Sequence, residues 1–187
     1  MKIKILGFKK NELIALFVIF SVLLVAIFVN LKISFRKARD AQRKGDIRGI
    51  YDALLLYHED FGVFPLAIDG MIAACEPVTF DTKGSPTFSA CRWGWDELRD
   101  VFDKDYPKYM TLPSDPHHTY GVRYLYVSNG NHFQIYAALE SAQEDEYKPE
   151  VVARNLNCGE EICNFGRSDG KTPLDKTLEE YENELRE

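Results

Sequence analysis

Between Phe8 and Lys44 the sequence has neither proline nor glycine, the two residues that most often interrupt a helix. Polar residues are also scarce in this part of the chain, since only Ser21 and Asn30 interrupt the apolar run from Leu13 to Leu31. A run of that length at helical rise spans roughly 28 Å, which matches the hydrocarbon core of a bilayer. The sequence therefore predicts a membrane-spanning helix.

The features of a cleaved secretory signal are missing. Such a signal has a shorter apolar core and a small-residue cleavage site directly after it. Here the charged sequence NLKISFRKARDAQRK (residues 30–44) follows the apolar run and contains no A-x-A site. No cysteine lies near the run either, which argues against a lipoprotein anchor.

Known catalytic motifs are missing as well. The sequence contains no H-E-x-x-H, no G-x-S-x-G and no P-loop. His117 and His118 follow Asp115 in a predicted turn, and we interpret them as surface turn residues rather than as metal ligands. The sequence thus predicts a protein that is not an enzyme, with no catalytic residue and no metal site.

Charge is divided unevenly along the chain. Residues 1–49 contain eleven Lys and Arg against three acids, a net charge of +8, and residues 50–187 contain twelve against twenty-six, a net charge of −14. An acidic head without interleaved basic and aromatic residues does not predict a nucleic-acid partner. A basic stem with an acidic head is the polarity expected where stems lie near the heads of other copies; the simpler interpretation is a solvated acidic surface.

The four cysteines predict disulfides and an oxidising compartment. Three pairings are possible. The short separations favour Cys75–Cys91 and Cys158–Cys163, and the first bond would contribute about 3 kcal/mol in the loop-entropy model. A zinc site is the rival interpretation, but the spacings contain no C-x-x-C knuckle.

The arrangement Gly7-Phe8-x-x-x-Glu12, followed by an apolar helix, resembles the type IV pilin and type II secretion pseudopilin superfamily. The resemblance continues through KARDAQRKGDIRGIYDALLLYHEDFGVFP (residues 37–65). The sequence departs from the family in two places: Lys-Lys-Asn replaces the usual Thr-Leu-Ile ahead of Glu12, and Val29 stands where many pilins have a proline.

The resemblance implies a prepilin. A leader of residues 1–7 would be removed by the prepilin peptidase between Gly7 and Phe8, and the new amine of Phe8 would be N-methylated. Glu12 would pair with that amine on a neighbouring subunit during assembly. The single-pass precursor would carry its head outside the cytoplasm, and the mature chain would polymerise with itself in a cell-surface or periplasmic filament, with an inner-membrane assembly platform and membrane lipid as further partners.

The expected function is thus that of a structural subunit of a type IV pilus-like or type II secretion pseudopilus filament. The alternative is a monomeric, single-pass, membrane-anchored binding domain outside the cytoplasm that shares the stem.

The predicted fold is α+β and pilin-like: a long N-terminal helix packed on a small antiparallel sheet, with disulfide-held loops. The expected segments are the leader (1–7), the transmembrane and assembly half of the helix (8–31), its amphipathic half (32–64) and the head (65–187). Gly62 and Pro65 should end the helix. The amphipathic half carries an apolar stripe at helical spacing that should bury against the sheet, made of Ile47, Ile50, Tyr51, Leu54, Tyr57 and Phe61.

Within the head, residues 66–92 are rich in turn formers and are expected to be a loop. Residues 93–107 suggest a short helix, with the two tryptophans Trp93 and Trp95 as core residues; a carbohydrate platform is the other interpretation of this pair.

Two alternating runs, residues 122–127 and 132–139, flank an Asn-Gly turn and predict a hairpin. Phe133, Ile135, Ala137 and Leu139 would share the face that covers the helix. Residues 151–155 are expected to be a third strand, 158–164 a small clip and 171–187 a terminal helix.

No cofactor is predicted, and calcium is the one ion considered. The resemblance to pseudopilins, which bind calcium in a loop after the sheet, draws attention to Asp169 and Asp175 near the carboxyl end.

Overall fold

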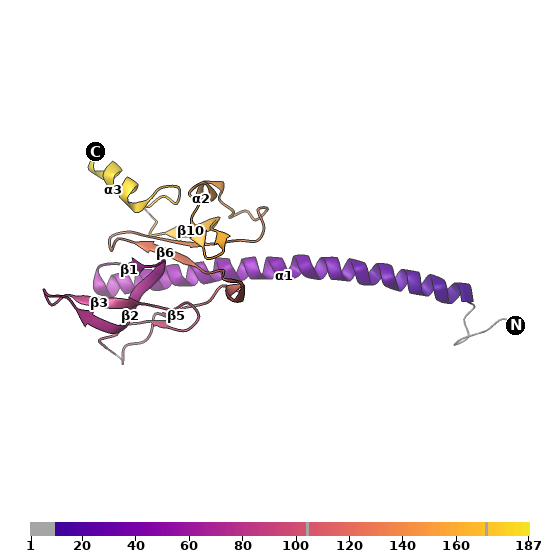
Figure 1. The fold of residues 1–187 in the computed structure, drawn as a ribbon, viewed down its shortest axis with the longest axis horizontal. Helices are drawn as coiled ribbons and strands as arrows, with labels where there is room; N and C mark the ends of the chain where they lie inside the picture. Colours follow the sequence, from indigo (N-terminus) through magenta and orange to yellow (C-terminus); the bar gives the residue numbers. More distant parts are fainter. Residues whose placement is uncertain (1–9, 104, 171) are drawn as a thin grey trace. The chain divides into compact units, whose positions relative to one another are not determined.

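The computed structural model describes residues 10–103, 105–170 and 172–187. The chain forms two compact units, one within residues 1–39 and the other comprising Asp40–Glu187. Helix α1 (Lys10–Phe61) contributes its first part to one unit and its last part to the other (Figure 1). Each unit is described by itself.

In the first unit, the described part of α1 is largely apolar and exposed. Its large apolar side chains from Ile14 to Phe35 are 37% to 72% exposed. One stretch of the helix is long and apolar enough to cross a membrane, and none of that stretch is buried. The predicted single-pass character is therefore consistent with the structure.

In the second unit, residues 40–61 of α1 supply part of the core. Ile47, Ile50, Leu54 and Tyr57 of the predicted stripe are buried, whereas Phe61 at the helix end is 37% exposed. The helix ends at Phe61, and Gly62 follows in the left-handed region (φ 72°) with its N–H donating to the carbonyl of His58 at 2.8 Å. A glycine is favoured at this position because it adopts positive φ without a Cβ clash.

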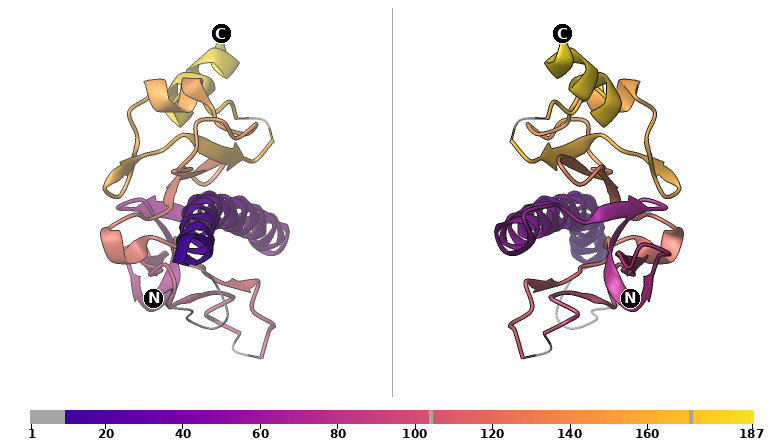
Figure 2. Two further views of the ribbon diagram at one scale, coloured as in Figure 1. Left: turned by 90° about the vertical axis from the view of Figure 1, so that its right-hand side faces the viewer. Right: turned by 90° about the vertical axis from the view of Figure 1, so that its left-hand side faces the viewer.

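The head contains ten short strands in the described residues. They are β1 (Leu66–Ile68), β2 (Met71–Phe80), β3 (Pro86–Ala90), β4 (Glu97–Leu98), β5 (Met110–Thr111), β6 (Leu125–Ser128), β7 (Phe133–Ala137), β8 (Asn157–Cys158), β9 (Glu161–Ile162) and β10 (Phe165–Ser168). They form two three-stranded antiparallel sheets, β1-β2-β3 and β10-β7-β6, and two small pairs, β4-β5 and β8-β9. Within this unit, β6 and β10 are drawn on one side of α1 and β2 and β3 on the other (Figures 1 and 2).

The predicted hairpin is confirmed as β6 and β7, paired from Leu125↔Tyr136 to Ser128↔Phe133. Its predicted inward residues, Phe133 to Leu139 at alternate positions, are buried in the same cluster as the helix stripe. The other face of β7 is covered too, because Tyr136 packs in a second cluster with Val151 and the Cys158–Cys163 bond. β7 is therefore a central strand, buried on both faces.

Three predictions for residues 66–107 are wrong. The expected loop at 66–92 contains the β1-β2-β3 sheet, in which turn residues such as Asp69-Gly70 only join the strands. The expected helix after Trp93 is instead a turn followed by β4. Trp95, expected in the core, is 79% exposed, while Trp93 packs against the core and its ring lies edge-on to Tyr124.

The carboxyl part of the head agrees in part with the sequence. The expected strand at 151–155 is wrong: Pro149–Ala153 forms the short helix α2, which begins with a proline in its first turn. The clip at 158–164 is confirmed as the β8-β9 pair. The terminal helix is confirmed as α3 (Leu178–Arg186), whose N-cap Thr177 forms a capping box with Glu180.

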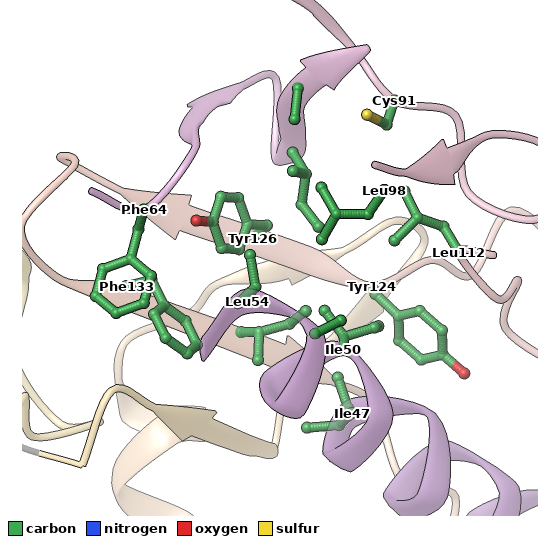
Figure 3. Packing of buried hydrophobic residues seen from close by; sticks show 14 of the residues in the cluster. Ile47, Ile50, Leu54, Phe64, Cys91, Leu98, Leu112, Tyr124, Tyr126 and Phe133 are labelled. Carbon is green, nitrogen blue, oxygen red and sulfur yellow. The ribbon is translucent and has the colours of Figure 1, made fainter. Parts of the chain in front are cut away.

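The α+β class, the long apolar N-terminal helix, the antiparallel sheets and both favoured disulfides are confirmed. The main core lies where α1 meets the two larger sheets and the disulfide-bonded loop. Figure 3 shows Ile47, Ile50 and Leu54 of α1 facing Tyr126, Leu98 and Leu112.

Candidate functional site

The sequence places its most specific functional residues at the amino terminus. Gly7 and Phe8, the predicted cleavage and methylation positions, lie outside the described residues. Glu12 lies in the first turn of α1 and is exposed. It precedes the apolar stretch directly, so a carboxylate would stand near the edge of a bilayer core, where its cost is smaller than at the centre.

The two polar residues inside the apolar stretch bond to their own helix. Ser21 Oγ donates to the Phe17 carbonyl at 2.8 Å, and Asn30 Nδ2 donates to the Ala26 carbonyl at 3.0 Å. Such bonds to the preceding turn give each polar group a partner without help from another segment. This part of α1 can therefore enter an apolar environment, whether of lipid or of other helices, with little free-energy cost from unsatisfied polar groups.

Arg43 lies at the start of the helix segment that belongs to the head, and it is 1% exposed. Its Nε and Nη2 donate to the two oxygens of Asp115 at 2.8 and 3.0 Å. Its Nη1 donates to Asp40 at 2.9 Å and to Glu140 at 2.8 Å. One guanidinium thus joins α1 to the turn before β6 and to the segment after β7. We call these four residues the Arg43 cluster.

The carboxylates of the Arg43 cluster also accept backbone bonds. Asp40 accepts from the N–H groups of Glu140 and Ser141 at 2.8 and 3.2 Å, and Asp115 accepts from the N–H of His117 at 2.7 Å. Burial by itself would lower the pKa of Arg43, but the hydrogen bonds to Asp115 and Glu140 outweigh burial and raise it. The cation is therefore permanent, and the cluster fixes the helix to the head.

Sequence reasoning missed the Arg43 cluster, although a signal was present. Arg43 precedes Ile47, Ile50 and Leu54 at helical spacing, so it extends the buried apolar stripe by one turn. A charged residue on a buried stripe requires a partner. Asp40 precedes Arg43 by three residues, but Asp115 and Glu140 could not be named from the sequence because they lie 72 and 97 residues away.

The acidic loop after the hairpin is bonded to α1 as well. Lys44 Nζ donates to Glu144 at 2.9 Å and to Glu146 at 3.0 Å. The hydrogen bond to Glu144 and, to a smaller extent, the one to Glu146 raise the pKa of Lys44. The hydrogen bond from Lys44 lowers the pKa of Glu146. Some of the positive charge of the stem is therefore paired with acidic residues of the head of the same chain.

The histidine pair noted in the sequence serves the turn that holds Asp115. His118 Nδ1 lies 3.0 Å from the Asp115 carbonyl, and His117 Nδ1 lies 3.7 Å from Glu140. Both belong to the short 3-10 helix region η1 (His118–Tyr120) and its N-cap. The structure brings them beside the Arg43 cluster rather than to a separate pocket.

Asp169, one of the two residues considered for calcium, is engaged in other contacts. Asp169 accepts from Thr172, through its N–H at 3.0 Å and its hydroxyl at 2.8 Å, and lies 2.5 Å from His132 Nδ1. Within the part of the chain that the structure describes, no group of three or more His, Cys, Asp or Glu side chains is placed to hold a metal ion.

A shallow cavity lies beside the exposed Trp95. Its volume is about 360 Å³, and it is lined by Cys75, Glu76, Trp95, Asp96, Glu97, Arg99 and Val101. The bond from Arg92 lowers the pKa of Asp96, and the bond from Lys108 lowers the pKa of Glu97. Both carboxylates are thus ionised near neutral pH, and the cavity combines one aromatic face with charged groups.

Comparison of the chain with protein-family models, with curated proteins and with solved structures found no match. The class of protein is therefore defined by the structure itself: an α+β head with two disulfides, whose first helix has an apolar, membrane-length stretch. The resemblance to pilins and pseudopilins depends on residues 7–65 of the sequence.

Proposed function

We propose that this protein is the structural subunit of a type IV pilus-like or type II secretion pseudopilus filament. In this proposal the prepilin peptidase removes residues 1–7, the amine of Phe8 is methylated, and the mature chain leaves the membrane to polymerise with copies of itself on an inner-membrane assembly platform. The observation that carries the proposal is the apolar part of α1, whose side chains are exposed from Ile14 to Phe35.

An apolar surface of this extent requires a cover. Soluble monomers rarely expose contiguous apolar patches beyond a few hundred Å². Lipid covers such a helix in the precursor. In a filament the same side chains would be covered by the corresponding helices of neighbouring subunits, so one surface serves both states. The length of the first part of α1 supports this use, because residues 10–39 are longer than the roughly 20 residues that a simple anchor needs.

Glu12 gives the proposed assembly its register. A carboxylate at the edge of the apolar stretch interacts more strongly with a cation in a low-dielectric environment than in water. The methylated amine of Phe8 on a neighbouring subunit supplies such a cation once the leader is removed. Processing and assembly are thereby coupled, because an uncleaved chain has no amine at that position.

The first test is the intact mass of the natural protein, which reports processing and oxidation together. We expect the mass of residues 8–187, increased by the net CH2 of one N-methylation and reduced by the four hydrogens lost in two disulfides. A chain that keeps residues 1–7 and is found singly dispersed in the membrane would contradict the proposal and support the membrane-anchored binding domain instead.

The second test separates membrane insertion from assembly. Glu12→Gln should still insert in the membrane, but the yield of filaments seen by electron microscopy should fall at least about tenfold, since a coupling of 1.4 kcal/mol already corresponds to that factor. Ser21→Ala is the matched control. Ser21 bonds to its own helix in the structure, so this variant should assemble normally. Wild-type filament yield from Glu12→Gln would refute the role of Glu12.

The third test concerns the leader. Gly7→Leu should leave residues 1–7 attached, as judged by mass or by mobility on a gel, and should prevent filament formation. Mature protein of normal length from this variant would show that cleavage does not occur at Gly7.

A further inference from the structure

Trp95 is the most exposed large apolar side chain of the described residues, at 79%. Exposing an indole to water is unfavourable, since a tryptophan buries a large apolar area when it is covered. Trp93, two residues earlier, follows the usual pattern and packs against the core. The exposure of Trp95 is therefore a local feature of the loop that carries it.

That loop is tightly held. Arg92 donates to Asp96 through its backbone N–H at 2.7 Å and through Nη2 at 3.0 Å. Gly94 donates its N–H to the Leu112 carbonyl at 3.0 Å, and Leu112 donates to the Asp96 carbonyl at 3.0 Å. Cys91, directly before Arg92, is disulfide-bonded to Cys75 of β2.

Gly94 also allows the loop to pack closely. Its φ is +81°, and a Cβ at this position would lie 2.8 Å from the Cβ of Ser114. Below the loop, Cys91, Leu98 and Leu112 belong to the buried core (Figure 3). The indole is thus presented on a fixed support, so a ligand would not have to order it on binding, and the entropic cost of binding is reduced.

The cavity beside Trp95 has the size and chemistry of a small-ligand site. Its volume of about 360 Å³ lies within the range of about 300–1,000 Å³ typical of such sites. Glu76, Asp96 and Glu97 supply hydrogen-bond acceptors, and Arg99 supplies donors. Glu97 already accepts from Lys108 at 2.6 Å, but a carboxylate has about four lone-pair sites and can accept further bonds.

This lining favours one class of ligand. The carboxylates of Glu76, Asp96 and Glu97 are balanced by the lining Arg99 and by Arg92 and Lys108, which bond to Asp96 and Glu97. The rim therefore has no excess of positive charge to attract nucleic acids, phosphates or acidic polysaccharides. An apolar peptide would have to desolvate the charged rim without compensation. A saccharide matches both parts: its C–H face can lie on the indole, and its hydroxyls both donate to carboxylates and accept from a guanidinium.

We propose that Trp95, together with Asp96, Glu97 and Arg99, forms a binding site for a neutral saccharide. The indole stacks on the apolar face of one sugar ring, and the charged side chains bind its hydroxyls. This site goes beyond the proposed function and does not depend on assembly, since all of its residues lie in one chain.

The test uses the full chain in phosphatidylcholine nanodiscs, prepared without maltoside or glucoside detergents, whose headgroups are themselves sugars. A Trp93→Phe background leaves Trp95 as the single tryptophan, since the chain has two. Maltohexaose, cellohexaose and chitohexaose are titrated against tryptophan fluorescence and, in parallel, by calorimetry. We expect a saturable response to at least one of them, with a Kd on the order of 0.1–1 mM, and no response to a heparin hexasaccharide.

The variants assign the response to the indole. In the wild-type background, Trp95→Ala should weaken binding by calorimetry at least about tenfold, and Trp95→Phe should retain part of it. Tyr120→Ala is the matched control, because Tyr120 is 74% exposed and does not line the cavity. Near-UV circular dichroism checks that each variant is folded.

Several results would overturn the proposal. They are no binding of any neutral hexasaccharide up to about 10 mM, undiminished binding by Trp95→Ala, equal loss in Tyr120→Ala, or tighter binding of the heparin fragment. Reduced filament yield of Trp95→Ala without saccharide binding by the wild type would assign the indole to a contact between subunits instead. Failure of this test leaves the proposed filament function untouched, because that function is tested by mass, microscopy and Glu12→Gln.

Discussion

The two parts of helix α1 belong to one continuous helix and differ in what covers them. Residues 10–39 expose large apolar side chains, for example Phe17 at 72% and Leu23 at 55%. Residues 40–61 bury theirs, with Ile47, Ile50 and Leu54 at 0%. Helix formation is thus common to both parts, and the cover distinguishes them: the head's own sheets in one case, and lipid or, as we propose, other subunits in the other.

Polar groups follow the same division. Ser21 and Asn30 bond to carbonyls four residues back in their own helix. Arg43 instead bonds to Asp115 and Glu140, 72 and 97 residues away. Local polar bonds would allow the first part of α1 to exchange lipid for other subunits, as we propose. The bonds of Arg43 to Asp115 and Glu140 instead break only when the head unfolds.

The largest expected effect tests this difference at charged residues. Arg43→Met should lower the free energy of unfolding of the head by about 3–5 kcal/mol, because it leaves Asp40 and Asp115 buried without their cation. Lys37→Met, an exposed cation in the first part of α1, should change it by less than about 0.5 kcal/mol. Urea unfolding in nanodiscs, followed by tryptophan fluorescence, measures both. Equal effects would mean that the Arg43 cluster does not hold the head to the helix.

The next effect tests the same difference at one apolar residue type. Leu54→Ala should destabilise the head by about 2–5 kcal/mol, since it opens a cavity in the main core. Leu23→Ala should leave the unfolding of the head unchanged. If the proposed function is right, Leu23→Ala should instead reduce filament stability against heat or detergent. A loss of head stability in Leu23→Ala would contradict the division of α1 between the two units.

The parts that were predictable from sequence depend on local periodicity. The apolar run, the helix end at Gly62, the stripe from Ile47 to Tyr57 and the Asn-Gly hairpin all repeat at helical or strand spacing or end in a turn signal. The cysteine pairing was favoured by separation alone and is present. Each of these features is decided within a few residues or a short loop.

The parts that were missed depend on distant partners. The β1-β2-β3 sheet was hidden because turn formers separate its strands and because β1 and β3 have only three and five residues. Their pairing with β2 is decided by packing against the core. Val151 and Val152 suggested a strand, but Pro149 in the first turn and burial of Val151 under β7 produce α2. Trp95 was expected inside because indoles usually are, and only the bonded loop reveals that it faces outward. The Arg43 cluster combines residues up to 100 positions apart.

A smaller effect is expected where a partly buried group of α1 meets the head. Tyr124 donates its hydroxyl to Asp46 Oδ2 at 2.6 Å, and Tyr124 itself is 1% exposed. Tyr124→Phe should therefore lower the free energy of unfolding by about 1.5–3 kcal/mol, the usual net value of a hydrogen bond to a charged group. Tyr120→Phe, at a ring that is 74% exposed, should have no measurable effect. Equal stability of Tyr124→Phe and wild type would show that water replaces this bond without loss.

The smallest effect is a pH dependence, and Asp46 and Glu146 should show it with opposite signs. Burial, only partly offset by the bond from Tyr124, raises the pKa of Asp46 above its ordinary 3.8, so the folded head binds this proton more tightly than the unfolded chain. The contribution of Asp46 to stability therefore falls as the pH rises from 3.8 to the raised folded value, and stays constant above it. Asp46→Asn should gain stability relative to wild type across that window.

Glu146 provides the opposite case, because the bond from Lys44 lowers its pKa below the ordinary 4.5. Its contribution is complete above pH 4.5 and is lost as the pH falls through the lowered folded value. Glu146→Gln should accordingly lose stability relative to wild type as the pH rises through the same acid range. Urea unfolding of both variants between about pH 3 and 7 measures the two slopes. Slopes of the same sign would mean that burial at Asp46 does not outweigh its hydrogen bond. The contact between Asp46 and Tyr124 would then be more exposed to water than the structure indicates.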